Sequence, residues 1–119
     1  MIATTIGQSK RLLELGLDPK TADCMWLVTS RARLHVLDGE PISNYDRWEN
    51  YPAWSLSALL EVMPKPDLYR ETADLWVCVT FFKEGSIRGF GETAIDASCD
   101  TITKMFGRGY LIKKGGQDE

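Results

Sequence analysis

The first helical pattern of the chain starts at a capping motif. Thr5 and Gln8 stand three residues apart, the spacing at which a hydroxyl and an amide cap each other's backbone N–H groups at a helix start. Leucines at helical spacing follow, and Gly16 is the residue type that commonly ends a helix in the left-handed conformation. The pattern therefore predicts a helix over residues 5–15, followed by a short helical turn that Asp18 caps.

Two further helices are predicted by the same kind of signal. Ser55 opens an amphipathic stretch that ends before Pro64, and Thr93 with Asp96 repeats the hydroxyl-to-acid capping spacing. The second of these stretches closes at Gly107 and Gly109. The apolar positions that recur at helical spacing are Leu56, Leu59, Leu60 and Met63 in the first stretch, and Ala94 or Ile95, Cys99, Ile102, Met105 and Phe106 in the second.

Strand patterns fill most of the space between these helices. Residues 24–36 contain a β-prone run followed by alternating apolar and polar positions, which fits two strands or one strand with a ragged partner. Residues 40–50 are polar with interspersed aromatics and are predicted to form a loop. Residues 74–82 and 86–91 read as a β-hairpin that offers the amphipathic helices a surface to pack on.

The fold class that these elements predict is α+β. We expect a small, mainly antiparallel sheet with helices from Thr5, Ser55 and Thr93 packed on one face. The 119 residues, with 44% hydrophobic and 26% charged content, suit a single globular domain. We assign residues 1–112 to that domain and residues 113–119 to a polar, frayed C-terminal tail.

Charge and cysteine content indicate which binding partners and which cellular compartment suit the chain. The net charge of −3 and a pI near 5.2 argue mildly against a protein whose main work is to neutralise phosphates. Cys24, Cys78 and Cys99 are odd in number and widely spaced, which fits buried thiols in a reducing compartment better than a disulfide framework. We see neither a signal peptide nor an apolar run long enough to cross a membrane, and expect a cytoplasmic protein with no membrane partner.

Three blocks of the chain resemble one group of sequences. Residues 2–23, 52–61 and 109–116 are together similar to small uncharacterised proteins of gut Bacteroidetes that are often found in prophage-like or mobile-element settings. The central block, from Pro52 to Glu61, is the most distinctive of the three. The resemblance implies a genomic setting, and it supplies no activity and no catalytic residue.

Residues that could carry chemistry are few and scattered. His35 is the single histidine, and Asp38 is near enough in sequence to tune it as an acid or base, although a solvent-facing strand residue explains it better. Gly85, Gly89 and Gly91 could suggest a phosphate loop, although a hairpin turn with strand-end glycines explains them better. The carboxylates of the predicted loop region lack the spacing of a calcium site and read as a solvated face; they are Asp38, Glu40, Asp46 and Glu49.

The cysteines offer no clearer chemistry. Cys24, Cys78 and Cys99 lack the sequence context of a nucleophile, and Cys78 stands inside an apolar strand pattern. We therefore predict no catalytic residue, no metal and no cofactor. A helix-turn-helix starting at residue 5 would place the acidic segment 18–23 against DNA, which its charge disfavours.

Two surfaces remain as candidates for binding. An aromatic set spaced about three residues apart could face a protein partner, because Trp and Tyr dominate binding hot spots, or could fold inward over the core; its members are Tyr45, Trp48, Tyr51 and Trp54. A basic cluster near the C-terminus could bind nucleic acid; its members are Lys104, Arg108, Lys113 and Lys114.

The function that we favour from the sequence is a non-enzymatic accessory or interaction protein of a prophage or mobile element. It would work through contacts with an unidentified protein partner or through self-association as a homodimer. A nucleic-acid-binding module using the basic cluster is the first alternative. An enzyme with a site assembled from scattered residues such as His35 and a cysteine is the second.

Overall fold

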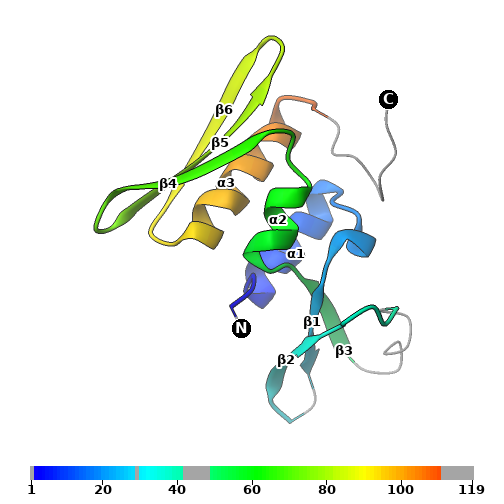
Figure 1. Cartoon of the computed structure of the whole chain (residues 1–119). Coiled ribbons are helices and arrows are strands. Elements are labelled where there is room, and N and C mark those ends of the chain that lie inside the picture. Colours follow the sequence, from blue (N-terminus) through cyan, green and yellow to red (C-terminus); the bar gives the residue numbers. More distant parts are fainter. Residues whose placement is uncertain (1, 29, 42–48, 111–119) are drawn as a thin grey trace.

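Figure 1 shows the fold, a computed structural model in which residues 2–28, 30–41 and 49–110 are described. These described residues form three α-helices, a short 3-10 helix and six strands. In order, the elements are α1 (Ile6–Leu15), the 3-10 helix η1 (Pro19–Thr21), β1 (Cys24–Val28), β2 (Ala32–Val36), β3 (Glu49–Ala53), α2 (Leu56–Glu61), β4 (Pro66–Thr72), β5 (Leu75–Phe82), β6 (Gly85–Gly91) and α3 (Ala94–Gly107).

The three predicted helix starts are confirmed. The Gln8 backbone N–H donates to Thr5 Oγ1 over 3.1 Å, and the Thr5 N–H donates to Gln8 Oε1 over 2.9 Å, so the capping box is complete. Ser55 and Thr93 accept from backbone N–H groups three residues further on in α2 and α3. At the other end of α1, Gly16 has the left-handed φ of 110° that its position predicts.

The α+β class is confirmed, but the strands form two sheets where one was expected. One antiparallel sheet has the order β2-β1-β3 and the other the order β4-β5-β6. Figure 1 shows the two sheets at opposite ends of the molecule with the helices between them. Helix α3 packs on β5 and β6, whereas α1 contacts β3 and α3, and α2 contacts α3. The helices therefore do not share a single sheet face.

Two strands were not predicted. β3 includes Glu49 and Asn50, which the sequence assigned to a loop, and β4 follows the proline that was taken as the end of the middle helix. Both are edge strands in their sheets. The expected pair of strands within residues 24–36 is present as β1 and β2, and the hairpin formed by β5 and β6 is also confirmed.

One hydrophobic core joins all three helices to the β4-β5-β6 sheet. Its fully buried residues include Leu12 of α1, Leu59 of α2 and Ile102 of α3, together with Cys78 of β5 and Ile87 of β6. The single domain over residues 1–112 stays a prediction, because its C-terminal boundary and the tail over residues 113–119 lie outside the described residues.

A small polar network fixes the N-terminal segment and α2 relative to β1. Thr4 is buried, and it exchanges backbone and side-chain hydrogen bonds of 2.9 and 3.0 Å with the backbone of Trp54. The Asp23 carboxylate, just before β1, accepts from the backbone N–H of Ser55 over 2.8 Å and from its hydroxyl. These bonds hold the start of α2 beside residues 2–4, where the largely apolar pocket described below opens.

Candidate functional site

The predicted aromatic surface does not form as proposed. Trp54 has no exposed surface, and its indole Nε1–H donates to Thr21 Oγ1 over 2.9 Å. Its assignment as a partner-binding residue is therefore wrong, because the ring packs in the core among the helices. Tyr51 is half-buried on β3, with Lys10 Nζ 4.8 Å from its ring centroid. Tyr45 and Trp48 lie outside the described residues.

The basic cluster is represented in the structure by two of its members. Lys104 Nζ donates to the backbone carbonyl of Arg88 over 2.9 Å, lies 3.1 Å from Asp100 Oδ2, and stands 5.1 Å from the ring centroid of Phe90. This ammonium is thus engaged with the edge of β6, which weighs against a role in binding phosphate. Arg108 is exposed at the C-cap of α3. Lys113 and Lys114 lie outside the described residues.

His35 lies on β2 with its side chain 36% exposed, as the sequence predicted for a solvent-facing strand residue. Its Nε2 is 3.0 Å from Glu40 Oε1, so the neighbouring carboxylate belongs to Glu40 and not to Asp38, which occupies a left-handed turn with φ of 47°. Asp46 and the side chain of Glu49 lie outside what the structure describes. Among the described residues, no group of three or more His, Cys, Asp or Glu side chains could hold a metal ion.

The glycines that could suggest a phosphate loop have a packing role. A Cβ atom on Gly89 would lie 2.3 Å from the backbone nitrogen of Thr101, and one on Gly91 would lie 2.6 Å from that of Ala97. Both glycines thus let α3 rest directly on β6. Gly85 opens β6 after the hairpin turn, with φ of 147°. The hairpin interpretation therefore holds.

The three thiols are held in their protonated form. Burial raises the pKa of Cys24 from 9.0 to about 11, with a further contribution from the charge of Asp23. Burial likewise raises the pKa of Cys78, and it raises that of Cys99 to about 12, where Asp96 and Asp100 add to the effect. Because the thiolate is the nucleophile, none of these cysteines is poised for covalent chemistry near neutral pH.

We expect the folded protein to react slowly with a thiol-specific chromogenic reagent. At pH 8 the rise in the pKa of Cys24 leaves about 100-fold less thiolate than an unperturbed cysteine has, and burial slows access further. The urea-unfolded protein is the control, since all three thiols then regain ordinary reactivity. A native cysteine that reacts at the unfolded rate near pH 8 would contradict this account and reopen the search for a nucleophile.

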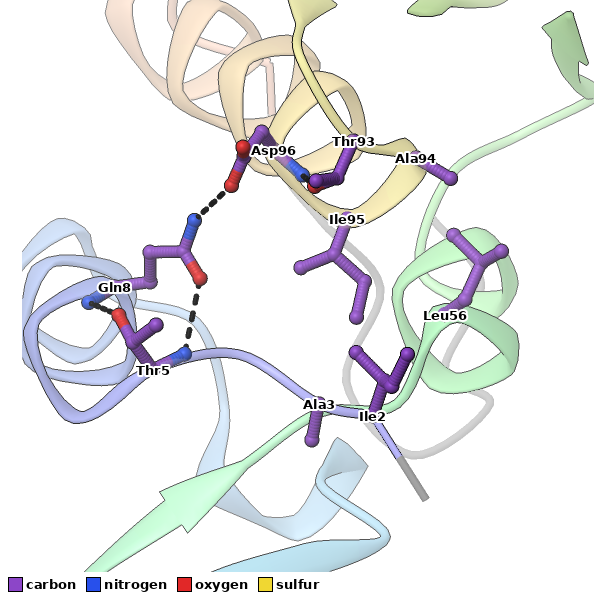
Figure 2. Close-up of a pocket in the computed structure, with 9 residues that line it drawn as sticks. All are labelled: Ile2, Ala3, Thr5, Gln8, Leu56, Thr93, Ala94, Ile95 and Asp96. Atoms are coloured by element: carbon purple, nitrogen blue, oxygen red, sulfur yellow. Dashed lines mark hydrogen bonds between the residues drawn. The ribbon is translucent and has the colours of Figure 1, made fainter.

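A pocket of about 370 Å³ lies where the N-terminal segment meets the starts of all three α-helices. In Figure 2 the side chains of Ile2 and Ile95 point toward each other, and the Leu56 side chain lies beside them and points toward Ala94. Ala3 and Ala94 complete the apolar wall, and Ile2 is 79% exposed at the rim. The volume falls at the lower end of the range for small-ligand pockets, and the lining is mostly apolar, as such sites usually are.

Polar side chains on one side of the pocket bond to one another. Gln8 Nε2 donates to Asp96 Oδ1 over 2.7 Å, while Gln8 Oε1 accepts from the Thr5 N–H, as Figure 2 shows. Thr93 Oγ1 accepts from the Asp96 N–H over 3.0 Å. The Gln8 side chain therefore braces the start of α1 against the start of α3. The arrangement suits the binding of an apolar group, and its lining contains no histidine, cysteine or lysine that could serve as base or nucleophile.

Sequence reasoning missed this pocket although its three helix starts were recognised. Thr5 and Thr93 were predicted as caps and Ser55 as the start of a helix, and each prediction is confirmed. The signal that could have pointed to the site is the apolar residue next to two of these caps, Leu56 and Ala94. Nothing in a linear sequence shows that three helices begin at one place.

Comparisons with known proteins add no family to this picture. Neither a family model, nor a curated protein, nor a solved structure matches the chain. None of the helices within the described residues is both long and apolar enough to cross a membrane.

Proposed function

We propose that this protein is a non-enzymatic, cytoplasmic interaction protein of a prophage or mobile element, and that it binds an apolar side chain of a protein partner in the pocket of Figure 2. The observation that carries the proposal is the apolar pocket between the three helix starts. The genomic setting rests on the resemblance of residues 2–23, 52–61 and 109–116 alone.

The pocket favours docking of an apolar anchor. Hot spots of protein interfaces are typically apolar or aromatic side chains inserted into well-formed pockets. The incoming group would bury the exposed Ile2 side chain at the rim. Each Å² of apolar surface that is buried stabilises the complex by about 25 cal/mol. His35 and the three cysteines of this chain do not line the pocket, and the Asp96 carboxylate at its wall accepts a hydrogen bond from Gln8, so the pocket favours binding of an apolar group.

Nucleic acid is a weaker candidate partner. Of the basic residues proposed for that role, Lys104 is engaged with Arg88, Asp100 and Phe90. A phosphate would have to compete with those contacts and with a net charge of −3. Nuclease treatment of the sample separates the two cases, because recovery through nucleic acid would disappear with the nuclease.

Filling the pocket should abolish partner capture without unfolding the protein. In Ala94→Phe the ring would occupy the space beside Leu56 and Ile95, and we expect at least a tenfold loss in recovery of the partner from lysate of the native host, with nuclease present. Ala73→Phe is the matched control, since Ala73 is exposed in the turn between β4 and β5. Both variants should keep the melting temperature of the parent protein to within a few degrees.

The result that would overturn the proposal is equally concrete. If Ala94→Phe stays folded and captures the same protein as the parent does, the pocket is not the docking site. If the parent recovers material only without nuclease, the nucleic-acid alternative replaces the protein partner. If both phenylalanine variants lose the partner equally, the loss is not specific to the pocket and the assignment fails.

A further inference from the structure

The β4-β5-β6 sheet has one covered face and one uncovered face. The Cβ position of Gly89 lies against the backbone of α3, and the Cys78 side chain packs in the core with helix residues, so both positions belong to the covered face. Neighbouring side chains along a strand alternate between faces. Figure 1 shows the helices on the α3 side, which leaves the opposite face without a covering layer in the described part of the chain.

Apolar side chains gather on this uncovered face. Tyr69, Phe81 and Phe90 are 39%, 45% and 44% exposed, and they are three of the five exposed large hydrophobic residues within the described part of the chain. Between the outer strands, Val77 and Val79 of β5 are buried. Contiguous apolar exposure of this kind on a soluble protein commonly marks an interaction surface.

Strand register arranges the face in two rows that cross all three strands. One row places Tyr69 opposite Val77 and Val77 opposite Phe90. The next row places Asp67 opposite Val79 and Val79 opposite Arg88. Directly paired residues in antiparallel strands point to the same face. One row therefore has an aromatic ring at each end, and the other row has an acid at one end and a base at the other.

We propose that this face binds the same face of a second copy of the chain, around a two-fold axis parallel to β5. Such an axis keeps each row in place and exchanges its ends, so that β4 of one copy lies opposite β6 of the other. Asp67 then meets Arg88 of the partner copy twice, and Tyr69 meets Phe90 twice. The charge pattern of the face is complementary to itself in this arrangement. An axis across the strands would instead place β4 opposite β4, and an axis through the row of Asp67 would oppose Asp67 to Asp67.

The edge of the sheet supports association through the face. At the outer edge of β6, the Phe90 N–H donates to Asp100 Oδ2 over 2.9 Å, and the Arg88 carbonyl accepts from Lys104. These backbone groups are therefore occupied by α3 and are not offered to another strand, which is the usual protection against edge pairing. Lys104 also stands over the Phe90 ring and steadies it at the rim of the face.

The size of the face sets the expected affinity. A sheet three strands wide and eight residues long at β5 presents roughly 400 Å². Stable dimers bury about 800 Å² per partner, so the self-association should be weak and reversible, with a dissociation constant of roughly tens to hundreds of micromolar.

Sedimentation equilibrium with charge-reversal variants tests the proposal. The parent protein should shift toward dimer mass between about 10 µM and 1 mM, and Asp67→Arg and Arg88→Asp should each weaken dimerisation about tenfold because like charges then face each other. The double variant Asp67→Arg, Arg88→Asp restores unlike pairs and should return to within about threefold of the parent. Glu61→Arg, an exposed charge reversal on α2, is the matched control.

Each alternative outcome overturns the proposal. A parent protein that stays monomeric at about 1 mM has no such interface. Dimerisation that neither single reversal weakens uses another surface, and a double variant as weak as the single ones rules out the pairing of β4 with β6. The pocket of Figure 2 lies on the helical side of the sheet, so Ala94→Phe should dimerise like the parent. The dimer proposal and the partner-capture proposal can therefore be contradicted separately.

Discussion

Replacing Gly89 by alanine should lower the free energy of unfolding by about 3 kcal/mol or more, because the added methyl group meets backbone atoms. The new Cβ would lie 2.3 Å from the Thr101 backbone nitrogen and 2.6 Å from the Ala97 carbonyl oxygen. A backbone cannot rotate away as a flexible side chain can, so α3 would have to move off β6. Urea denaturation followed by far-UV circular dichroism measures the effect.

Gly107→Ala is the matched control for this substitution. Gly107 is the last residue of α3, and no atom lies within 4 Å of the position a Cβ would take. Alanine there should be neutral or should stabilise the helix by roughly 0.5 to 1 kcal/mol. A Gly89→Ala protein as stable as the Gly107→Ala protein would show that α3 does not rest on β6 as closely as described.

Local signals allowed the helices to be predicted. A cap involves groups three residues apart, so Thr5 with Gln8 and Thr93 with Asp96 could be recognised without knowledge of the fold. The same holds for Gly16, whose left-handed conformation completes α1. These features depend on neighbours along the chain, and the structure places them where the sequence indicated.

Edge strands were harder to predict because their residues do not have to be apolar. In β4 only Leu68 is even partly buried, and the rest of the strand is exposed, so no alternation marks it. In β3, Glu49 and Asn50 belong to the polar stretch that was predicted to be a loop, and Pro52 is tolerated because β3 is an edge strand, where its missing N–H is not needed. Because these two strands were not predicted, the division of the strands into two sheets was not predicted either.

The candidate sites depend on contacts between distant segments, and the sequence shows none of them. The pocket needs Gln8 to reach Asp96, which lies 88 positions later in the chain. Likewise, the role of Lys104 changed from a candidate phosphate ligand to a contact with the edge of β6 once Arg88 and Asp100 were placed beside it. Residue types indicated which groups were present, and tertiary packing decided what they contact.

The same limit explains the error at Trp54. Spacing alone could not decide whether this ring faced a partner or the core, since an interface and a core are both rich in aromatic residues. The structure buries it completely and gives its indole N–H a partner in Thr21. A buried Trp that has its hydrogen bond satisfied is typical of a core position.

Trp54→Ala should therefore destabilise the protein by about 3 to 5 kcal/mol, through the cavity left among Leu12, Leu59 and the rest of the core. Trp54→Phe is the control that keeps most of the apolar volume and loses the hydrogen bond to Thr21. The free energy of unfolding of this variant should fall by only about 1 to 2 kcal/mol. Both values come from urea denaturation, measured alongside partner capture. If Trp54→Ala kept the stability of the parent and lost the partner, the ring would belong to the binding surface after all. A joint loss of stability and capture, with both retained largely in Trp54→Phe, is what a core position requires.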